Sequence, residues 1–309
     1  MSLPEVEGLS SSDVIESTMI PPMISLIFYG GYIVLYGICI HVIVKQRRTN
    51  YIINDIIITI LFNVVTGGLV SIMVNCFLQA KCDLAQSPIH ECQVLDHSEL
   101  EGTMFTTQVT IVIANIITDG ILIWRCYLIW NQKWSIIAPL IFICVANNGA
   151  LSVGFFFVPS AIVVVSHTQI TMEGIFFISF VMGGILTNVS LTLLIAGRII
   201  YISHGIKNFS TSSAQKMYQT IISATLESGL LYPFILVLYG SVTISHHLSK
   251  DAQTERQLFV AAGVLYSVLL PVMGIASTLI IVRIMLGIAV EDKKSIRDTA
   301  LVEIGEQSV

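Results

Sequence analysis

The segment Asn115–Trp130 reads NIITDGILIWRCYLIW and places two charged side chains inside an apolar run. Asp119 is an acid and Arg125 is a base, and the segment ends on aromatic residues. A charge inside an apolar membrane span is costly, so it needs a partner or a water-lined cavity. The segment therefore predicts a membrane-spanning helix, and its two charged residues are candidates for function.

The composition of the whole chain agrees with a membrane protein. The 309 residues are 54% hydrophobic and only 11% charged, with a mean hydropathy of +0.83. A soluble domain carries roughly 25% charged residues. The relevant unit is therefore the span of about 20 apolar residues that crosses a bilayer.

Seven apolar spans follow one another along the chain and predict an all-α fold, a seven-transmembrane helix bundle over residues 23–285. A short tail, 1–22, precedes it, a second tail, 286–309, follows it, and Asn131–Trp134 is expected to form a tight turn. The first residues are acidic, unlike a cleaved signal peptide, so the first helix is expected to stay uncleaved. The predicted helices lie at about 23–44, 52–78, 104–130, 135–159, 174–200, 217–244 and 257–285.

The positive charges predict how the bundle is oriented in the lipid bilayer. Of the 15 Lys and Arg residues, only Lys81, Lys250 and Arg256 fall on the side of the N-terminus. Cytoplasmic loops carry the excess of positive charge. We therefore predict an N-terminus outside, a cytoplasmic C-terminus and a multi-pass protein of the plasma membrane.

Two of the cysteines lie in a polar loop on the predicted outer side. Cys82 and Cys92 lie in this loop with nine residues between them. Disulfides form in oxidising compartments, so the two thiols are expected to form a bridge. Two free loop thiols are the alternative.

Several polar residues are predicted to share one depth, near the middle of the membrane. At a rise of about 1.5 Å per residue, Asp119 lies roughly 16 Å from the cytoplasmic end of its helix. Counting on the other helices gives similar depths, within a hydrocarbon core about 30 Å thick. The predicted central polar layer contains Asn63, Asn115, Asp119, Asn147, Asn148, Asn188 and Glu227.

This layer has two interpretations. It could be a hydrated site for a ligand or a cation, or a proton relay, since burial or a shared charge raises the pKa of a carboxyl group. Alternatively, buried amides and acids hydrogen-bond across helices and fix their packing. For the asparagines we favour the packing role, whereas Asp119 and Glu227 are open to both.

Arg125 is predicted to lie outside the central layer, near the cytoplasmic end of its helix. Asp55 starts the second span from the same side, so the two side chains have matching depth. We predict that they form an ion pair, which could be static or could break on activation.

Three segments resemble a known family. Asp119–Trp130, DGILIWRCYLIW, is similar to the third-helix signature of an uncharacterised group of seven-helix membrane proteins from mushroom-forming fungi. Thr187-Asn188 with Leu194–Arg198, LIAGR, resembles the fifth helix of that group, and Glu227-Ser228-Gly229 followed by Tyr232 resembles its sixth. The resemblance implies a receptor-like topology and assigns no chemistry.

Several classes of function find no support in the sequence. The seventh span contains no lysine that could hold retinal, and the histidines are not clustered at one depth as a metal site requires. No nucleophile with a placed base is visible, so we expect no enzyme, no cofactor and no nucleic-acid partner.

Two functions remain. The first is a receptor-like protein with a pocket for an unknown ligand and a cytoplasmic signalling partner. The alternative is a transporter or channel that uses the central polar layer. A receptor predicts a pocket that opens outward above a layer sealed inward, whereas a carrier predicts a path that opens both ways.

Overall fold

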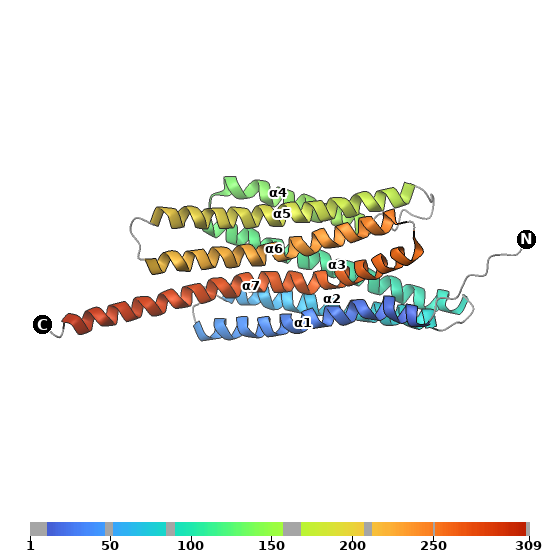
Figure 1. Ribbon diagram of the computed structural model, residues 1–309, viewed down its shortest axis with the longest axis horizontal. Coiled ribbons are helices and arrows are strands. Elements are labelled where there is room, and N and C mark those ends of the chain that lie inside the picture. Colours follow the sequence, from blue (N-terminus) through green and yellow to red (C-terminus); the bar gives the residue numbers. More distant parts are fainter. Residues whose placement is uncertain are drawn as a thin grey trace, which may run out of the picture.

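A computed structural model shows that the described elements are seven α-helices, which lie side by side along one direction (Figure 1). It describes residues 11–46, 52–84, 90–156, 168–206, 212–249 and 251–306, with side chains over 18–44, 55–81, 102–149, 179–201, 226, 229–246, 248–249, 251 and 253–283. The helices are α1 (Ser11–Gln46), α2 (Ile52–Leu84), α3 (His90–Ile129), α4 (Trp134–Phe156), α5 (Thr168–Ile206), α6 (Ser212–Leu248) and α7 (Ala252–Glu306).

The helices are apolar enough to make this a multi-pass membrane protein. Six of them contain segments of sufficient length to cross a bilayer. Within the described residues, α4 contributes a shorter apolar segment, Trp134–Gly149, and its predicted span continues outside them. Large apolar side chains such as Ile27 and Phe142, 74% and 75% exposed, cover the outer surface, as lipid-facing helices require.

All the described helices except α4 run beyond their predicted spans, and α1 begins at Ser11, inside the predicted N-terminal tail. α3 begins at His90, inside the predicted outer loop, and α7 continues to Glu306, through most of the predicted C-terminal tail (Figure 1). The apolar pattern marks only the part of a helix that lies in lipid. Polar helical extensions at either end carry no such signal.

The predicted tight turn between α3 and α4 is confirmed. Asn131 and Gln132 adopt left-handed backbone angles, with φ of 52° and 62°. The Gln132 amide donates to the Tyr127 carbonyl at 3.0 Å, and the Asn131 amide donates to the Leu128 carbonyl at 3.2 Å. These two bonds form a Schellman motif, which satisfies carbonyls at the end of α3 and reverses the chain.

α7 is the central packing element and contacts α1, α2, α3 and α6. Pro271 removes a hydrogen bond inside α7 and frees the Ser267 carbonyl one turn earlier. The Ser25 hydroxyl of α1 donates to this carbonyl at 2.7 Å, and the Ser267 hydroxyl donates to the Pro21 carbonyl at 2.9 Å. The reciprocal pair joins α1 to α7 and compensates for the proline.

The start of α7 is capped by Asp251, outside the membrane span. Its carboxylate accepts hydrogen bonds from the Thr254 amide at 3.1 Å and from the Thr254 hydroxyl at 2.7 Å. These bonds favour the charged form and lower the pKa of Asp251. The cap is therefore intact above the usual aspartate pKa and is lost as the pH falls through the lowered value.

Gly68 allows α2 to approach its neighbours closely. A Cβ atom at this position would collide with the Leu270 side chain of α7 and would lie 2.6 Å from Cγ2 of Thr110 in α3. The adjacent Gly67 has nothing within 4 Å of the same added atom. Gly68 is therefore required for close helix packing, whereas Gly67 is not.

We expect Gly68→Ala to lower the free energy of unfolding by about 1–3 kcal/mol, the usual cost of overpacking. Gly67→Ala is the matched control, and its effect should be neutral or slightly stabilising, because alanine favours helix more than glycine does. Unfolding in mixed micelles, titrated with sodium dodecyl sulfate and followed by circular dichroism, measures both. Equal effects of the two substitutions would contradict the close contact.

Candidate functional site

The carboxyl group of Asp119 lies at the centre of a buried hydrogen-bond cluster between α3, α4 and α6. Its Oδ2 atom accepts from Asn115 Nδ2 at 3.3 Å, Cys144 Sγ at 3.2 Å and Asn148 Nδ2 at 3.3 Å. Asn115 also donates to Asn148 Oδ1 at 3.0 Å and accepts from the Tyr232 hydroxyl at 3.2 Å. We call these five residues the Asp119 cluster.

The cluster leaves one carboxyl oxygen without a partner. Asp119 is 1% exposed, and its Oδ1 atom makes no hydrogen bond to any described residue. Every described side chain that bonds to the carboxyl group is neutral. A bare buried carboxylate is strongly disfavoured, so this group requires a proton, a cation or water at Oδ1.

The structure brings together most of the predicted polar layer. Asn115, Asn148 and Asp119 bond directly, and Asn188 of α5 lies close to the same carboxyl group, although its amide nitrogen donates to the Gly184 carbonyl at 3.0 Å. Asn147 is 6% exposed and packs on Gly183, and its amide atoms have no partner among the described residues.

One member of the predicted layer, Asn63, does not join it, and the side chain of another, Glu227, lies outside the described residues. Asn63 is exposed, and its side chain donates to the Thr59 carbonyl of its own helix at 2.8 Å. The sequence predicted the depth of Asn63 but not the face of α2 on which it lies. In the structure this face points away from the Asp119 cluster. The backbone of Glu227 lies in α6, but its side chain is outside the described residues.

Sequence reasoning missed two members of the cluster, Cys144 and Tyr232. Cys144 precedes Asn148 by four positions, so both lie on one face of α4. Tyr232 directly precedes Pro233, inside α6. The first spacing is a usable signal, whereas nothing in the sequence pairs Tyr232 with Asn115.

The predicted ion pair between Arg125 and Asp55 is not formed in the structure. Neither side chain makes a hydrogen bond or ion pair with another described residue, and Arg125 Nη1 is buried without a partner. Both charges lie within electrostatic range of the Cys39 thiol. Counting residues gives the depth of a side chain but not the face of the helix on which it lies, and that face decides which side chains meet.

The predicted Cys82–Cys92 disulfide stays a prediction, since both side chains lie outside the described residues. The four cysteines with described side chains, Cys39, Cys76, Cys126 and Cys144, are free thiols.

A pocket of about 620 Å³ lies between α1, α2, α3 and α7. It is partly open and lies toward the end of the bundle predicted to face outward, because Thr18 precedes the first predicted span, Gln79 directly follows the second, and Met104 begins the third. Its volume falls within the range of roughly 300–1,000 Å³ that is typical of small-molecule sites. We call it the outer pocket.

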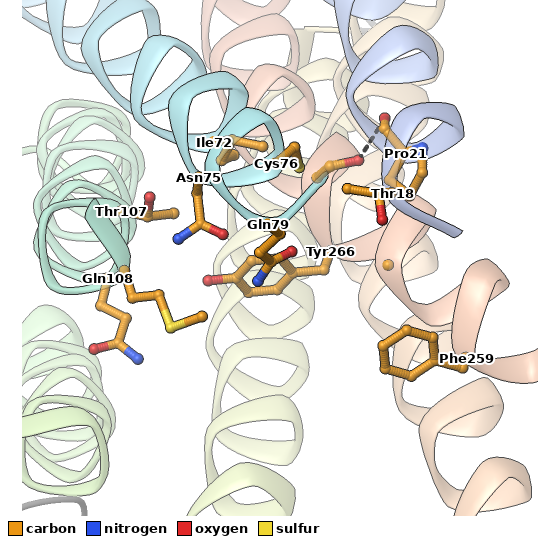
Figure 2. A pocket seen from close by; sticks show the side chains of 13 residues that line it. Thr18, Pro21, Ile72, Asn75, Cys76, Gln79, Thr107, Gln108, Phe259 and Tyr266 are labelled. Carbon is orange, nitrogen blue, oxygen red and sulfur yellow. Dashed lines mark hydrogen bonds between the residues drawn. The ribbon is translucent and has the colours of Figure 1, made fainter. Parts of the chain in front are cut away.

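The lining of the outer pocket is neutral on all described sides. Figure 2 shows Asn75, Gln79 and Gln108 on the α2 and α3 side, and Phe259 on the α7 side. The lining residues are Thr18, Pro21, Ile72, Asn75, Cys76, Gln79, Met104, Thr107, Gln108, Phe259, Gly263, Tyr266 and Ser267, and none carries a charge.

Three polar groups in this lining have unused hydrogen-bonding capacity. The side-chain amides of Gln79 and Gln108 and the hydroxyl of Tyr266 make no hydrogen bond to another described residue. By contrast, the Asn75 amide donates to the Thr103 hydroxyl at 3.1 Å. The pocket therefore presents neutral donors and acceptors next to apolar surface.

The outer pocket and the Asp119 cluster lie on the same face of α3. Asn115 follows Gln108 by seven positions, which is two helical turns or about 10 Å. Beyond the cluster, toward the α3–α4 turn, the interior is closed by a second set of buried apolar side chains. This inner apolar cluster consists of Leu122, Cys126, Ile137, Leu140, Leu191, Ile195 and Ile280.

Together, these features define a multi-pass α-helical membrane protein with a neutral pocket at one end and a buried polar cluster beneath it. No protein-family model, curated protein or solved structure matches the chain.

Proposed function

We propose that this protein is a receptor-like protein of the plasma membrane, which binds a neutral amphipathic small molecule in the outer pocket and signals to a cytoplasmic partner. The observation that carries the proposal is the order of the three layers along the bundle. The pocket lies toward one end of the bundle, the Asp119 cluster is buried beneath it, and the inner apolar cluster follows. A receptor needs a site that opens to one side only.

The chemistry of the lining supports a neutral ligand. A carboxylate or an ammonium group in the pocket would lose its hydration and find no opposite charge among the described lining residues. An amide or a hydroxyl group could instead bond to Gln79, Gln108 and Tyr266, while an alkyl chain lies on Ile72, Phe259 and other apolar side chains.

Three probes of equal chain length test the ligand class: octanamide, octanoate and octylamine. Cys76 lines the pocket, so its alkylation by N-ethylmaleimide in the full-length protein reports occupancy. We expect octanamide to slow this reaction and the charged probes not to do so. In a Gln79→Leu/Gln108→Leu variant, the apparent affinity for octanamide should fall by about fivefold for each hydrogen bond lost.

The variant also controls for partitioning into lipid, which the two substitutions do not change. Equal protection by all three probes, or unchanged protection in the variant, would contradict the neutral site. Signalling is measured separately by a fluorophore at Lys133→Cys, in the turn beyond the inner apolar cluster. If octanamide protects Cys76 without changing this fluorescence, the pocket exists but the receptor function does not.

A transporter or channel is the second candidate, and the unpartnered Oδ1 atom of Asp119 favours it. A carrier that uses this carboxyl group should lose flux completely in Asp119→Asn, whereas a receptor should bind its ligand and change only in coupling. Probe uptake into liposomes that contain the wild-type protein or the variant separates the two.

A further inference from the structure

Arg125 lines a second cavity, of about 240 Å³, between α2, α3 and α7. It is the only charged residue in the described lining, and its Nη1 atom is buried without a partner. An arginine keeps its charge at any physiological pH. A cation at this place, inside a membrane span, therefore requires an anion that the described part of the chain does not supply.

The remaining lining is apolar, and its α3 part extends from Arg125 toward the middle of the membrane, while Ile57 of α2 and Ile281 of α7 lie near the same end of the bundle as Arg125. Ile117, Gly120, Ile121 and Trp124 occupy one face of α3 on the side toward the middle of the membrane. Gly120 is exposed and Trp124 is 49% exposed, so the cavity opens on the lipid-facing surface. Arg125 itself lies four residues, or about 6 Å, from the end of the span at Ile129.

We propose that this cleft binds an anionic phospholipid of the leaflet that faces the α3–α4 turn. The phosphate bonds to Arg125, and one acyl chain follows Ile117, Gly120 and Trp124 toward the bilayer centre. Along α3 the cation lies nearer the membrane surface and the apolar wall lies deeper, which matches the order of headgroup and chain in a lipid. A free phosphate ion would use only the cation.

The site is independent of the outer pocket and of the proposed receptor function. The two cavities share no lining residue. Gly120 also provides a substitution that leaves the charge in place, because a Cβ atom there would meet nothing within 4 Å. A leucine at this position fits the fold and fills the apolar part of the cleft.

The test is native mass spectrometry of the full-length protein, titrated in micelles with palmitoyl-oleoyl-phosphatidylglycerol. We expect Arg125→Gln to weaken binding of the first lipid by about fivefold, the effect of one cation near an anionic lipid. Gly120→Leu should weaken it similarly. Lys133→Gln, which removes an exposed cation in the adjacent turn, should leave it within about twofold.

Two results would overturn the proposal. If Lys133→Gln weakens binding as much as Arg125→Gln, the lipid responds to surface charge and not to the cleft. If Gly120→Leu binds as the wild type does, or if inorganic phosphate displaces the lipid, the site takes an anion without an acyl chain.

Discussion

Asp119→Ala is expected to lower the free energy of unfolding by about 2–4 kcal/mol, because it leaves several buried donors without an acceptor. Oδ2 accepts from Asn115, Cys144 and Asn148, and alanine removes that atom. Part of the cost is recovered, since Asn115 and Asn148 still bond to each other at 3.0 Å. Titration with sodium dodecyl sulfate, followed by circular dichroism, measures the change.

Asp119→Asn separates the lost acceptor from the lost charge. Its amide oxygen replaces Oδ2 as the acceptor, and its amide nitrogen occupies the position of the unpartnered Oδ1. The asparagine variant should therefore lose less stability than the alanine variant, since the donors of Asn115, Cys144 and Asn148 keep an acceptor and only the introduced amide nitrogen lacks a described partner. Asn63→Ala is a second control, because Asn63 is exposed and bonds only to its own helix.

An alanine variant as stable as the asparagine variant would show that the cluster does not hold α3 to α4. A large loss in Asn63→Ala would have a different meaning. It would show that amide removal anywhere in these helices is destabilising, and that the Asp119 cluster is not special.

The helices could be predicted because a segment that crosses the lipid bilayer must be apolar over a sufficient length. Apolar length alone identifies the spans, and a tight turn at Asn131–Trp134 was predicted between two of them, although not its left-handed backbone angles. The helix ends could not be predicted, because helical residues outside the bilayer need not be apolar. His90, where α3 begins, lies among charged residues that fit a loop and a helix equally well.

The sequence predicted only how deep in the membrane the residues of the candidate site lie. Counting residues placed Asn115, Asp119 and Asn148 at one level, and they do meet. The same count included Asn63, which faces outward. In a soluble helix the apolar stripe tells which face is buried, but a helix in lipid is apolar on every side. The sequence therefore lacks the signal that separates a buried asparagine from an exposed one.

The residues that line the outer pocket were missed for the same reason. Asn75 and Gln79 are four positions apart and share a face of α2, which is a readable pattern. Whether that face meets α3 and α7 depends on the rotation of α2, which the sequence does not fix. A neutral amide in a span is also a weaker indication of a functional site than a charge, although amides line the larger of the two cavities described.

Gly263→Phe is expected to abolish binding of octanamide to the outer pocket. Gly263 lies on the α7 wall, and an added Cβ atom would make only ordinary contacts with Pro21, at 3.4 Å and 3.9 Å. A phenyl group can therefore enter the cavity without breaking the fold. If it displaces roughly 100 Å² of apolar ligand contact, the loss is about 2.5 kcal/mol, or nearly a hundredfold in affinity.

Equilibrium binding of radiolabelled octanamide to the full-length protein measures this loss, and Gly67→Phe is the matched control. Gly67 is exposed, lies outside the pocket lining and has free space around it. If both variants lose binding, the phenyl group acts through the helices and not through the cavity. If Gly263→Phe binds like the wild type, the outer pocket is not the ligand site, and the Asp119 cluster becomes the better candidate.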